Sequence, residues 1–287
     1  MNPFNLIPFA LAYIMFVLGL QLKLSDFNTI KRQPKAVLVG LFSQMVMVPA
    51  VAYTLLRFFP LDPQMQFGIM LLSFCAGGAT SNLLSFYAGG NLALSVCLTA
   101  LTSLLSMFTL PFLVGITYPI FLSGSVDHFN ATSLILKMLV LSTAPIIVGM
   151  LIRRYAENFV NRFIGGMQKV VNILFALLVV AAVAANWSVM VKQFSSVGLL
   201  VLVMAFILLW WGRTFSKVLG LDASVQKTIG IETGIQNGAM GIALAPFIMP
   251  ATMGGLPALA VPSAVYGVLM NLIILPYVWW CHTRMKR

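Results

Sequence analysis

Nine long runs of apolar residues, separated by short polar gaps, restrict this chain more than any other feature of its sequence. A helix needs about 20 apolar residues to cross the hydrocarbon core of a bilayer. Hydrophobic residues make up 60% of the 287 positions and charged residues only 8%, a composition unlike that of a soluble domain. The runs cover residues 3–20, 36–56, 65–88, 92–120, 134–152, 170–191, 197–219, 225–249 and 256–281. The sequence therefore predicts an all-α polytopic membrane protein with about nine transmembrane helices, a single domain over residues 1–287 that is surrounded by the lipid bilayer.

The Lys and Arg residues lie mostly in the gaps between the runs, and their distribution predicts an orientation. Nine spans place the two chain ends on opposite sides of the membrane. With a cytoplasmic C-terminus, 14 of the 17 basic residues fall on the cytoplasmic side, and only Arg57, Lys137 and Lys192 fall outside. Since cytoplasmic loops carry an excess of Lys and Arg, we expect an N-terminus outside and a cytoplasmic C-terminus.

The same distribution argues against a nucleic-acid partner. The formal net charge is +11, but the basic residues do not cluster on one segment. Short basic gaps between apolar runs suit anionic lipid headgroups instead. Three cysteines and two histidines show no metal-binding spacing, so we expect no transition-metal site. Nothing in the sequence indicates an obligate protein partner.

Two of the runs are interrupted near their centres by polar, glycine-rich segments. The first reads GGATSN over residues 77–82 and is followed by the pair Gly89-Gly90. The second reads ETGIQNG over residues 232–238. Each glycine lowers helix propensity by about 1 kcal/mol relative to alanine, so we expect two broken helices. The carbonyl groups that a break frees need partners in hydrocarbon.

Glu232 is the only acidic residue that falls inside a run and away from the membrane interfaces. A carboxylate at this depth costs about 2.5–3.5 kcal/mol on insertion scales, so we expect it to face a cavity and a cation. No Lys or Arg lies within one helical turn of Glu232, and Lys227 is five residues away. Close helix packing, which explains Ser103, Ser106 and Gly149, does not account for this acid.

Oxygen-bearing side chains near both breaks indicate the kind of cation. Ser95 and Thr99 are four residues apart and share one helix face. A tight turn at Gly89-Gly90 would bring them to Ser81 and Asn82. Hard cations prefer such oxygen ligands, so we expect a bound sodium ion or a proton. The candidates are Glu232, Gln236, Asn82, Ser81, Ser95 and Thr99, together with freed carbonyl groups.

The positions of the two breaks predict an internal duplication. Asn82 and Asn237 stand 155 residues apart. Broken helices in corresponding positions of two halves are typical of transporters with inverted repeats and a binding site near the membrane midplane. We expect a first repeat over residues 3–121, a second over residues 134–281, and a crossing of the two broken helices.

Three stretches of the sequence form a recognisable set. They are GGATSNLLSFYAGGNLALSVCLTALTSLL (residues 77–105), ETGIQNGAMGIALA (residues 232–245) and FSQMVMVPA around Gln44. The two longer stretches resemble the crossover motifs of the bile acid:sodium symporter family, and the order of the intervening segments is similar over nearly the whole chain. The resemblance implies a nine-helix bacterial member in the cytoplasmic (inner) membrane.

By this resemblance the chain would bind two sodium ions and one anion. One ion would be held by Ser81, Asn82, Ser95, Thr99 and Glu232, and the other by Gln44, Glu232, Gln236 and the backbone oxygens of Thr233 and Ile235. The substrate surface would include Asn237 and Asn271, together with Ala79 and Thr80. Ala79-Thr80 and Met270 differ from the residues of many relatives, so the identity of the anion is not carried over.

We therefore predict a sodium-coupled symporter for an organic anion, bile-acid-like or a small carboxylate, rather than an enzyme. A proton-coupled transporter with Glu232 as the proton carrier is the closest alternative. An intramembrane enzyme would need a Ser/His/Asp set or a carboxylate pair near the breaks, and the sequence has neither there. A passive channel would need a continuous polar stripe, and none is evident in the sequence.

Overall fold

The architecture was analysed in a computed structural model that describes residues 7–78, 80–122, 131–249 and 256–285. Every regular element in these ranges is a helix, as the apolar runs predict. Their bounds are α1 (Ile7–Gln21), η2 (Leu24–Phe27), α2 (Asn28–Arg32), α3 (Pro34–Phe42), η3 (Ser43–Met47), α4 (Val48–Leu55), α5 (Pro63–Phe74), α6 (Thr80–Tyr87), α7 (Leu92–Leu122), α8 (Ala131–Met138), η4 (Leu139–Thr143), α9 (Ala144–Tyr155), α10 (Glu157–Ala185), α11 (Trp187–Val218), α12 (Ala223–Gly234), α13 (Gly238–Ile248), η5 (Ala258–Ala260) and α14 (Val261–Met285).

Five stretches in the described residues are long and apolar enough to cross a bilayer. They are Pro34–Leu55, Leu92–Leu122, Glu157–Ala185, Trp187–Val218 and Ala258–Arg284, and a sixth is formed if Phe9–Gln21 and Ser25–Arg32, bent by 61°, count as one span. The predicted runs at 65–88 and 225–249 are each divided into two shorter helices, α5 with α6 and α12 with α13. The lengths of these helices alone therefore neither confirm nor contradict the predicted number of nine transmembrane helices.

Both predicted ends of the run at residues 170–191 are wrong. The helix that contains most of it, α10, begins at Glu157 and already ends at Ala185, and Lys192, placed in a gap between residues 191 and 197, lies inside α11. The break falls at Asn186, whose buried side-chain amide donates to the carbonyl oxygens of Ala182 at 3.0 Å and Leu256 at 2.9 Å. These bonds hold Asn186 out of a continuous helix, a long-range effect that hydropathy does not report.

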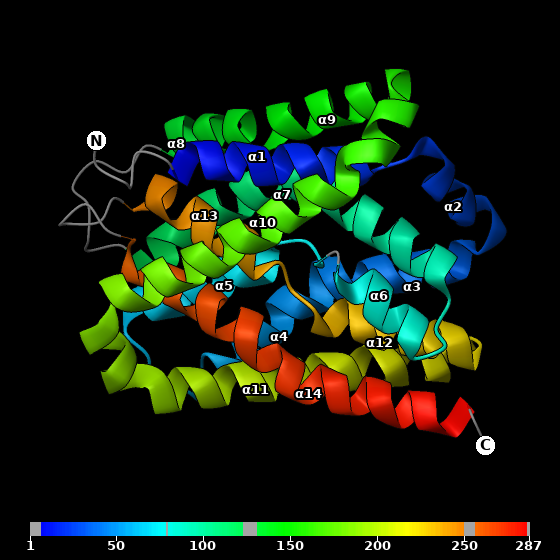
Figure 1. The fold of residues 1–287 in the computed structure, drawn as a ribbon. Coiled ribbons are helices and arrows are strands. Elements are labelled where there is room, and N and C mark those ends of the chain that lie inside the picture. The colour runs from blue at the N-terminus through cyan, green and yellow to red at the C-terminus, as the bar shows by residue number, and fades with distance from the viewer. Residues whose placement is uncertain (1–6, 79, 123–130, 250–255, 286–287) are drawn as a thin grey trace.

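Helices α1, α9 and α10 pack together as an outer layer, with α9 running along α1 at the top of Figure 1. Glycines allow the close approach of α1 and α9. A Cβ on Gly149 would lie 2.8 Å from the amide nitrogen of Leu20, and one on Gly19 would lie 2.9 Å from the Cα of Ile146. The interpretation of Gly149 as a packing residue is thereby confirmed.

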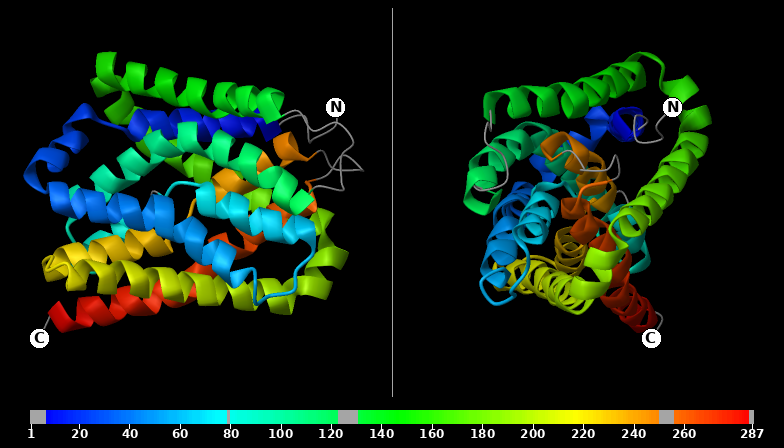
Figure 2. Two further views of the ribbon diagram at one scale, coloured as in Figure 1. Left: turned by 180° about the vertical axis from the view of Figure 1, so that it is seen from behind. Right: turned by 90° about the vertical axis from the view of Figure 1, so that its left-hand side faces the viewer.

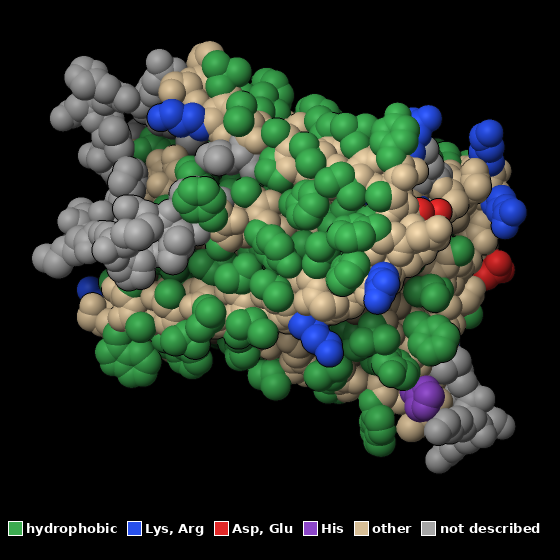
Figure 3. Space-filling view, turned by 45° about the horizontal axis from the view of Figure 1, so that its top comes forward, with side chains coloured by type: hydrophobic (Ala, Val, Ile, Leu, Met, Phe, Trp, Pro, Cys, Tyr) green, Lys and Arg blue, Asp and Glu red, His purple; other side chains and the backbone are tan. Residues whose placement is uncertain are grey.

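The broken pairs lie inside the bundle, against α7, α11 and α14 (Figure 2). Helix α1 begins at one end of the molecule and α14 finishes at the other (Figure 1). Hydrophobic side chains cover much of the surface seen in Figure 3, and most of the Lys and Arg side chains in that view lie toward one end. This arrangement leaves an apolar surface for lipid around a polar centre formed by the two breaks.

Candidate ion and substrate sites at the helix crossing

The first break separates α5 from α6. Helix α5 ends at Phe74, and Cys75 takes an extended conformation with ψ of 147°. Helix α6 starts at Thr80 and runs to the turn at Gly89, which has the positive φ of 66° that glycine tolerates. Ala79, a predicted substrate residue, lies outside the described residues. The expected reversal at Gly89-Gly90 is present, and it places α6 beside the start of α7.

The second break separates α12 from α13. Helix α12 ends at Gly234, and Ile235 is extended, with φ of −101° and ψ of 122°. Asn237 caps the next helix, because its side-chain oxygen accepts from the backbone N–H of Met240 at 3.1 Å. The break therefore directs the N-terminus of α13 toward the centre of the bundle.

The two breaks cross and share hydrogen bonds. The backbone N–H of Asn237 donates to the carbonyl oxygen of Ala76 at 3.0 Å. The buried hydroxyl of Tyr266 on α14 donates to the carbonyl oxygen of Gly234 at 2.9 Å. Carbonyl groups freed by each break thus find partners, as a hydrocarbon environment requires.

Glu232 lies at this crossing and is only 5% exposed. Its Oε1 accepts from the hydroxyls of Ser81, at 2.7 Å, and Ser95. Its Oε2 accepts from the hydroxyl of Thr99 at 3.0 Å. The side-chain oxygen of Asn82 lies 2.9 Å from the hydroxyl oxygen of Ser95 and 3.3 Å from that of Thr99. The structure therefore brings all five residues of the first predicted ion site together.

This cluster holds more close oxygen pairs than hydrogens to fill them. Besides the five contacts to Glu232 and Asn82, the Ser81 and Thr99 hydroxyls lie 3.3 Å apart. Three hydroxyl groups supply one hydrogen each. Since an ionised carboxylate and an amide oxygen only accept, the remaining oxygen contacts lack a hydrogen, which suits a bound cation or an added proton between these oxygens.

Glu232 has no ion-pair partner among the residues that the structure describes. The two ion pairs found there, with Lys23 and with Arg153, both use Glu157. The expectation that no basic side chain neutralises the buried carboxylate therefore holds over the described ranges.

Gln44 lies beside the second break, on a turn of π-helix inside the span of α3 and α4. Its Nε2 donates to Oε1 of Gln236 at 2.9 Å, and Nε2 of Gln236 donates to the carbonyl oxygen of Thr233 at 2.9 Å. Both glutamines are buried, and Oε1 of Gln44 has no hydrogen-bond partner in the described part of the chain. Single π-turns are frequent at functional sites.

The small residue Gly77 leaves space between the two breaks. An ideal Cβ at this position would lie 3.4 Å from Oε2 of Glu232 and 3.7 Å from the carbonyl oxygen of Ile235. Glu232 and Ile235, both predicted ligands of the second ion, therefore face the same small volume. Gln44 reaches this region through its bond to Gln236.

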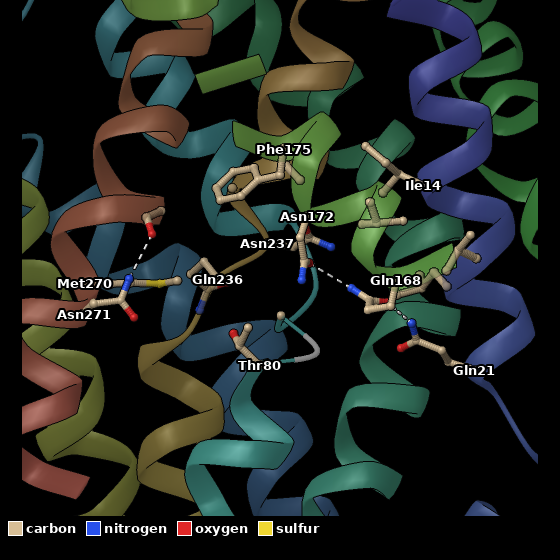
Figure 4. A pocket seen from close by; sticks show the side chains of 17 residues that line it. Ile14, Gln21, Thr80, Gln168, Asn172, Phe175, Gln236, Asn237, Met270 and Asn271 are labelled. Carbon is tan, nitrogen blue, oxygen red and sulfur yellow. Dashed lines mark hydrogen bonds between the residues drawn. The ribbon is translucent and has the colours of Figure 1, made fainter. Parts of the chain in front are cut away.

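A cavity of about 210 Å³ opens beside the crossing, toward α1 and α10 (Figure 4). Three predicted substrate residues, Thr80, Asn237 and Asn271, line it. Met270 and Gln236 line it as well. None of the described residues in its wall is Lys, Arg, His, Asp or Glu. The wall offers amide groups and apolar surface without a formal charge.

The opposite wall contains three carboxamide residues that the sequence analysis missed. Gln168 on α10 accepts from Gln21 on α1 and donates to Oδ1 of Asn172 at 3.1 Å (Figure 4). Gln168 escaped notice because it was assigned to the gap before a run at 170–191, whereas α10 begins at Glu157. An amide inside the otherwise apolar stretch 170–185 was the signal that could have identified Asn172.

Comparison with known proteins agrees with this geometry. Residues 8–193 match the Sodium Bile acid symporter family. The chain belongs to this family. It is therefore a membrane transporter and not an enzyme, and the family supports the predicted sodium-coupled transporter.

Several relatives are similar over most of the chain. It is 32% identical to an uncharacterized sodium-dependent transporter of Bacillus subtilis, over 91% of this chain and 78% of that protein. It is 30% identical to a probable chloroplast sodium/metabolite cotransporter of Oryza sativa subsp. japonica, over 93% and 62% of the two chains. A related probable cotransporter of Arabidopsis thaliana is 28% identical, over 94% and 65%. The chain thus spans slightly less than two thirds of these plant relatives.

Proposed function

We propose that this protein takes up a small organic anion together with two sodium ions that bind at the crossing of the broken helices. The observation that carries the proposal is the environment of Glu232: a buried carboxylate without a basic partner in the described residues, set among oxygens that hold too few hydrogens. Sodium, a hard cation, prefers such ligands.

The first ion lies among Ser81, Asn82, Ser95, Thr99 and Glu232. Four of these five residues come from α6 and α7, on either side of the turn at Gly89-Gly90, and the fifth comes from α12. The ion therefore links the two halves of the chain. It also coordinates oxygen atoms that would otherwise lie close together without a hydrogen between them.

The second ion lies among Gln44, Glu232, Gln236 and the carbonyl oxygens of Thr233 and Ile235. Its support is the buried Oε1 of Gln44, which has no partner in the described part of the chain. A buried acceptor left unsatisfied costs about 1–3 kcal/mol, and a cation removes that cost. Glu232 is the ligand that the two ions share.

The anion occupies the cavity beside the crossing. Because Oδ1 of Asn237 accepts from Met240, the amide N–H groups of Asn237 are left to donate to a ligand. The N-terminus of α13 adds partial positive charge there. In Asn271 the amide nitrogen already donates to the carbonyl oxygens of Gly267 and Val268, so we assign it a smaller part in holding a carboxylate. Thr80 completes this wall, and we include its neighbour Ala79 by sequence alone.

The size of the cavity favours a small carboxylate over a steroid acid. Its volume of about 210 Å³ is below the roughly 300–1,000 Å³ of sites for drug-sized ligands. The names of the plant relatives, sodium/metabolite cotransporters, agree with a small solute. Carboxamide groups on both walls suit a carboxylate that carries further polar groups.

The proposed stoichiometry balances charge. Two sodium ions and one Glu232 carboxylate leave one positive charge, which a monovalent anion neutralises. If the empty carrier returns with Glu232 alone, one net charge enters per cycle, worth about 2.3 kcal/mol at 100 mV. Two sodium ions moving down a tenfold gradient add roughly 2.8 kcal/mol. The sum of about 5 kcal/mol supports a substrate gradient of several thousandfold.

The proposed topology follows from the same elements. We assign the inverted repeats to residues 3–121 and 134–281, because the breaks at Gly77 and Ile235 occupy corresponding helices of the two halves. We place the end of the molecule that carries α2 and the C-terminus of α14 in the cytoplasm of a bacterium (Figure 1), because Lys31, Arg32 and Arg284 lie on these segments.

A thermal-shift titration tests the role of Glu232. Ligands that bind the folded state raise its melting temperature. Sodium, compared with choline at fixed pH, should stabilise the purified wild type and a control, Asp222→Asn, which changes an exposed acid at the start of the same helix. Glu232→Gln should fold without responding to sodium. A sodium response in Glu232→Gln, or transport by the wild type that follows a proton gradient in choline, contradicts the proposal and favours Glu232 as a proton carrier.

A second variant tests the number of ions. Gln44→Leu removes a ligand of the second ion only, so the sodium titration should lose cooperativity and keep a response from the first ion. Gln66→Leu is a matched control, since the side-chain amide of Gln66 donates to the carbonyl oxygen of Leu61 at 2.8 Å. An unchanged slope in Gln44→Leu would remove the second ion from the proposal.

A further inference from the structure

A second cavity, of about 360 Å³, lies where α1 ends and α9 meets α10. Leu22, Ser25, Met150 and Leu151 line it together with the charged residues Lys23, Arg153, Arg154 and Glu157. Three positive charges and one negative charge give this wall a net charge of +2. Asp26 lies nearby and accepts from the backbone N–H of Lys23 at 2.9 Å, but it lines a different cavity.

Arg153 is the unusual member of this wall, because it is buried to 93%, with 7% exposed. Its Nη1 donates to Oδ1 of Asn161 at 2.7 Å, and its Nη2 lies 3.5 Å from Oε1 of Glu157. Its Nε has no partner in the described part of the chain. A buried guanidinium donor without an acceptor is costly, and an anionic ligand in the cavity would supply that acceptor.

The single carboxylate of Glu157 does not neutralise all three basic side chains of this wall. The same atom, Oε1 of Glu157, lies 3.3 Å from Nζ of Lys23 and 3.5 Å from Arg153. One carboxylate oxygen thus contacts two cations, Lys23 before η2 and Arg153 on α9, and Arg154 has no ion pair among the described residues. The positive charge that remains faces the cavity.

The apolar surface beside the cavity indicates which anion fits. Ile147, Val148 and Leu151 are exposed on α9, spaced so that they share one helix face that leads from the cavity along this helix. The acyl chain of a lipid can pack against such an apolar surface, whereas a soluble phosphate cannot. Basic pockets between membrane helices are known to bind anionic headgroups.

We propose that this cavity binds the phosphate group of an anionic phospholipid, with Arg153 and Lys23 on the headgroup and the exposed face of α9 along an acyl chain. The ligand would join the ends of α1, α9 and α10, the layer that also forms one wall of the substrate cavity. Neither the ions nor the substrate of the proposed function enters this inference.

The test is a titration of the purified protein in neutral detergent with short-chain phosphatidylglycerol, short-chain phosphatidylcholine and glycerol 3-phosphate, read as melting temperature. The wild type should be stabilised by phosphatidylglycerol far more than by phosphatidylcholine. The variant Lys23→Gln/Arg154→Gln spares the buried Arg153, and its affinity for phosphatidylglycerol should fall roughly 25-fold, about fivefold for each basic side chain removed.

A control with the same change in charge makes the result specific. Lys31→Gln/Lys217→Gln removes two exposed lysines that do not line the cavity and should keep the wild-type preference. An equal loss in this control would overturn the proposal, since charge alone would then explain binding. Stabilisation by glycerol 3-phosphate equal to that by the lipid would also overturn it, because the site would then bind a soluble phosphate ester.

Discussion

The backbone N–H of Asn237 donates to the carbonyl oxygen of Ala76 at 3.0 Å, so each of the two broken helices satisfies a polar group of the other. This bond fixes the crossing within the apolar bundle. Glu232 is buried at this crossing, and the amide-lined cavity opens beside it. Disturbing the crossing should therefore affect both the proposed ion sites and the proposed substrate site.

Asn237 combines a structural and a binding role, and two substitutions separate them. Serine caps a helix about as well as asparagine, whereas alanine costs about 1 kcal/mol. We expect Asn237→Ala to lower the melting temperature, Asn237→Ser to leave it near the wild-type value, and both to weaken stabilisation by carboxylates. Equal melting temperatures would contradict the capping role, and an unchanged carboxylate response would remove Asn237 from the substrate site.

The substitution Gly77→Ala should weaken sodium binding more than it destabilises the fold. Its φ is not positive, so alanine can adopt the backbone conformation, and the added Cβ meets Glu232 and Ile235 at contact distances of 3.4 and 3.7 Å. We expect Gly77→Ala to fold and to need severalfold more sodium in a thermal-shift titration. Gly165→Ala, where a Cβ meets nothing within 4 Å, should match the wild type. A sodium midpoint unchanged in Gly77→Ala would refute the assignment of this volume to an ion.

Ser95→Ala with Thr99→Ala should raise the sodium requirement without reordering the carboxylates that the protein prefers. Hydrogen bonds to charged groups contribute about 1.5–3 kcal/mol, so we expect the sodium midpoint to rise at least about tenfold. Ser103→Ala is the control, because Ser103 lies one turn further along α7 and its buried hydroxyl has no partner in the described residues. A larger change in carboxylate preference than in sodium midpoint would argue against the first ion site.

Tyr266→Phe should destabilise the second break. The substitution leaves the buried carbonyl oxygen of Gly234 without its donor at 2.9 Å, which costs about 1–3 kcal/mol. Tyr277→Phe on the same helix removes a buried hydroxyl that bonds no backbone carbonyl in the described part of the chain, and should cost less. Equal melting temperatures for the two variants would show that the break does not depend on Tyr266.

The sequence was most informative where polar residues and glycines interrupt an apolar run. A carboxylate and paired glycines inside apolar runs predicted the breaks, and the i,i+4 spacing of Ser95 and Thr99 predicted a shared face. The structure places both hydroxyls on Glu232. These features depend on short segments, which a single sequence reveals.

Features that depend on distant contacts were missed. The end of α10 is fixed by the bond of Asn186 to Leu256, and the carboxamides of Gln21 and Gln168 meet only because α1 and α10 pack together. The π-turn at Gln44 likewise has no marker in hydropathy. The resemblance to a known family supplied Gln44 and Asn271, which the pattern of residues alone did not.

The wall of the proposed substrate cavity is made of carboxamides and apolar groups without a formal charge in the described residues. In the proposed function, exchanging one neutral side chain there alters which solute fits, while the charge around Glu232 stays the same. The proposal therefore predicts that a lineage of such transporters can change its solute by a few point substitutions in this wall and keep the ion site.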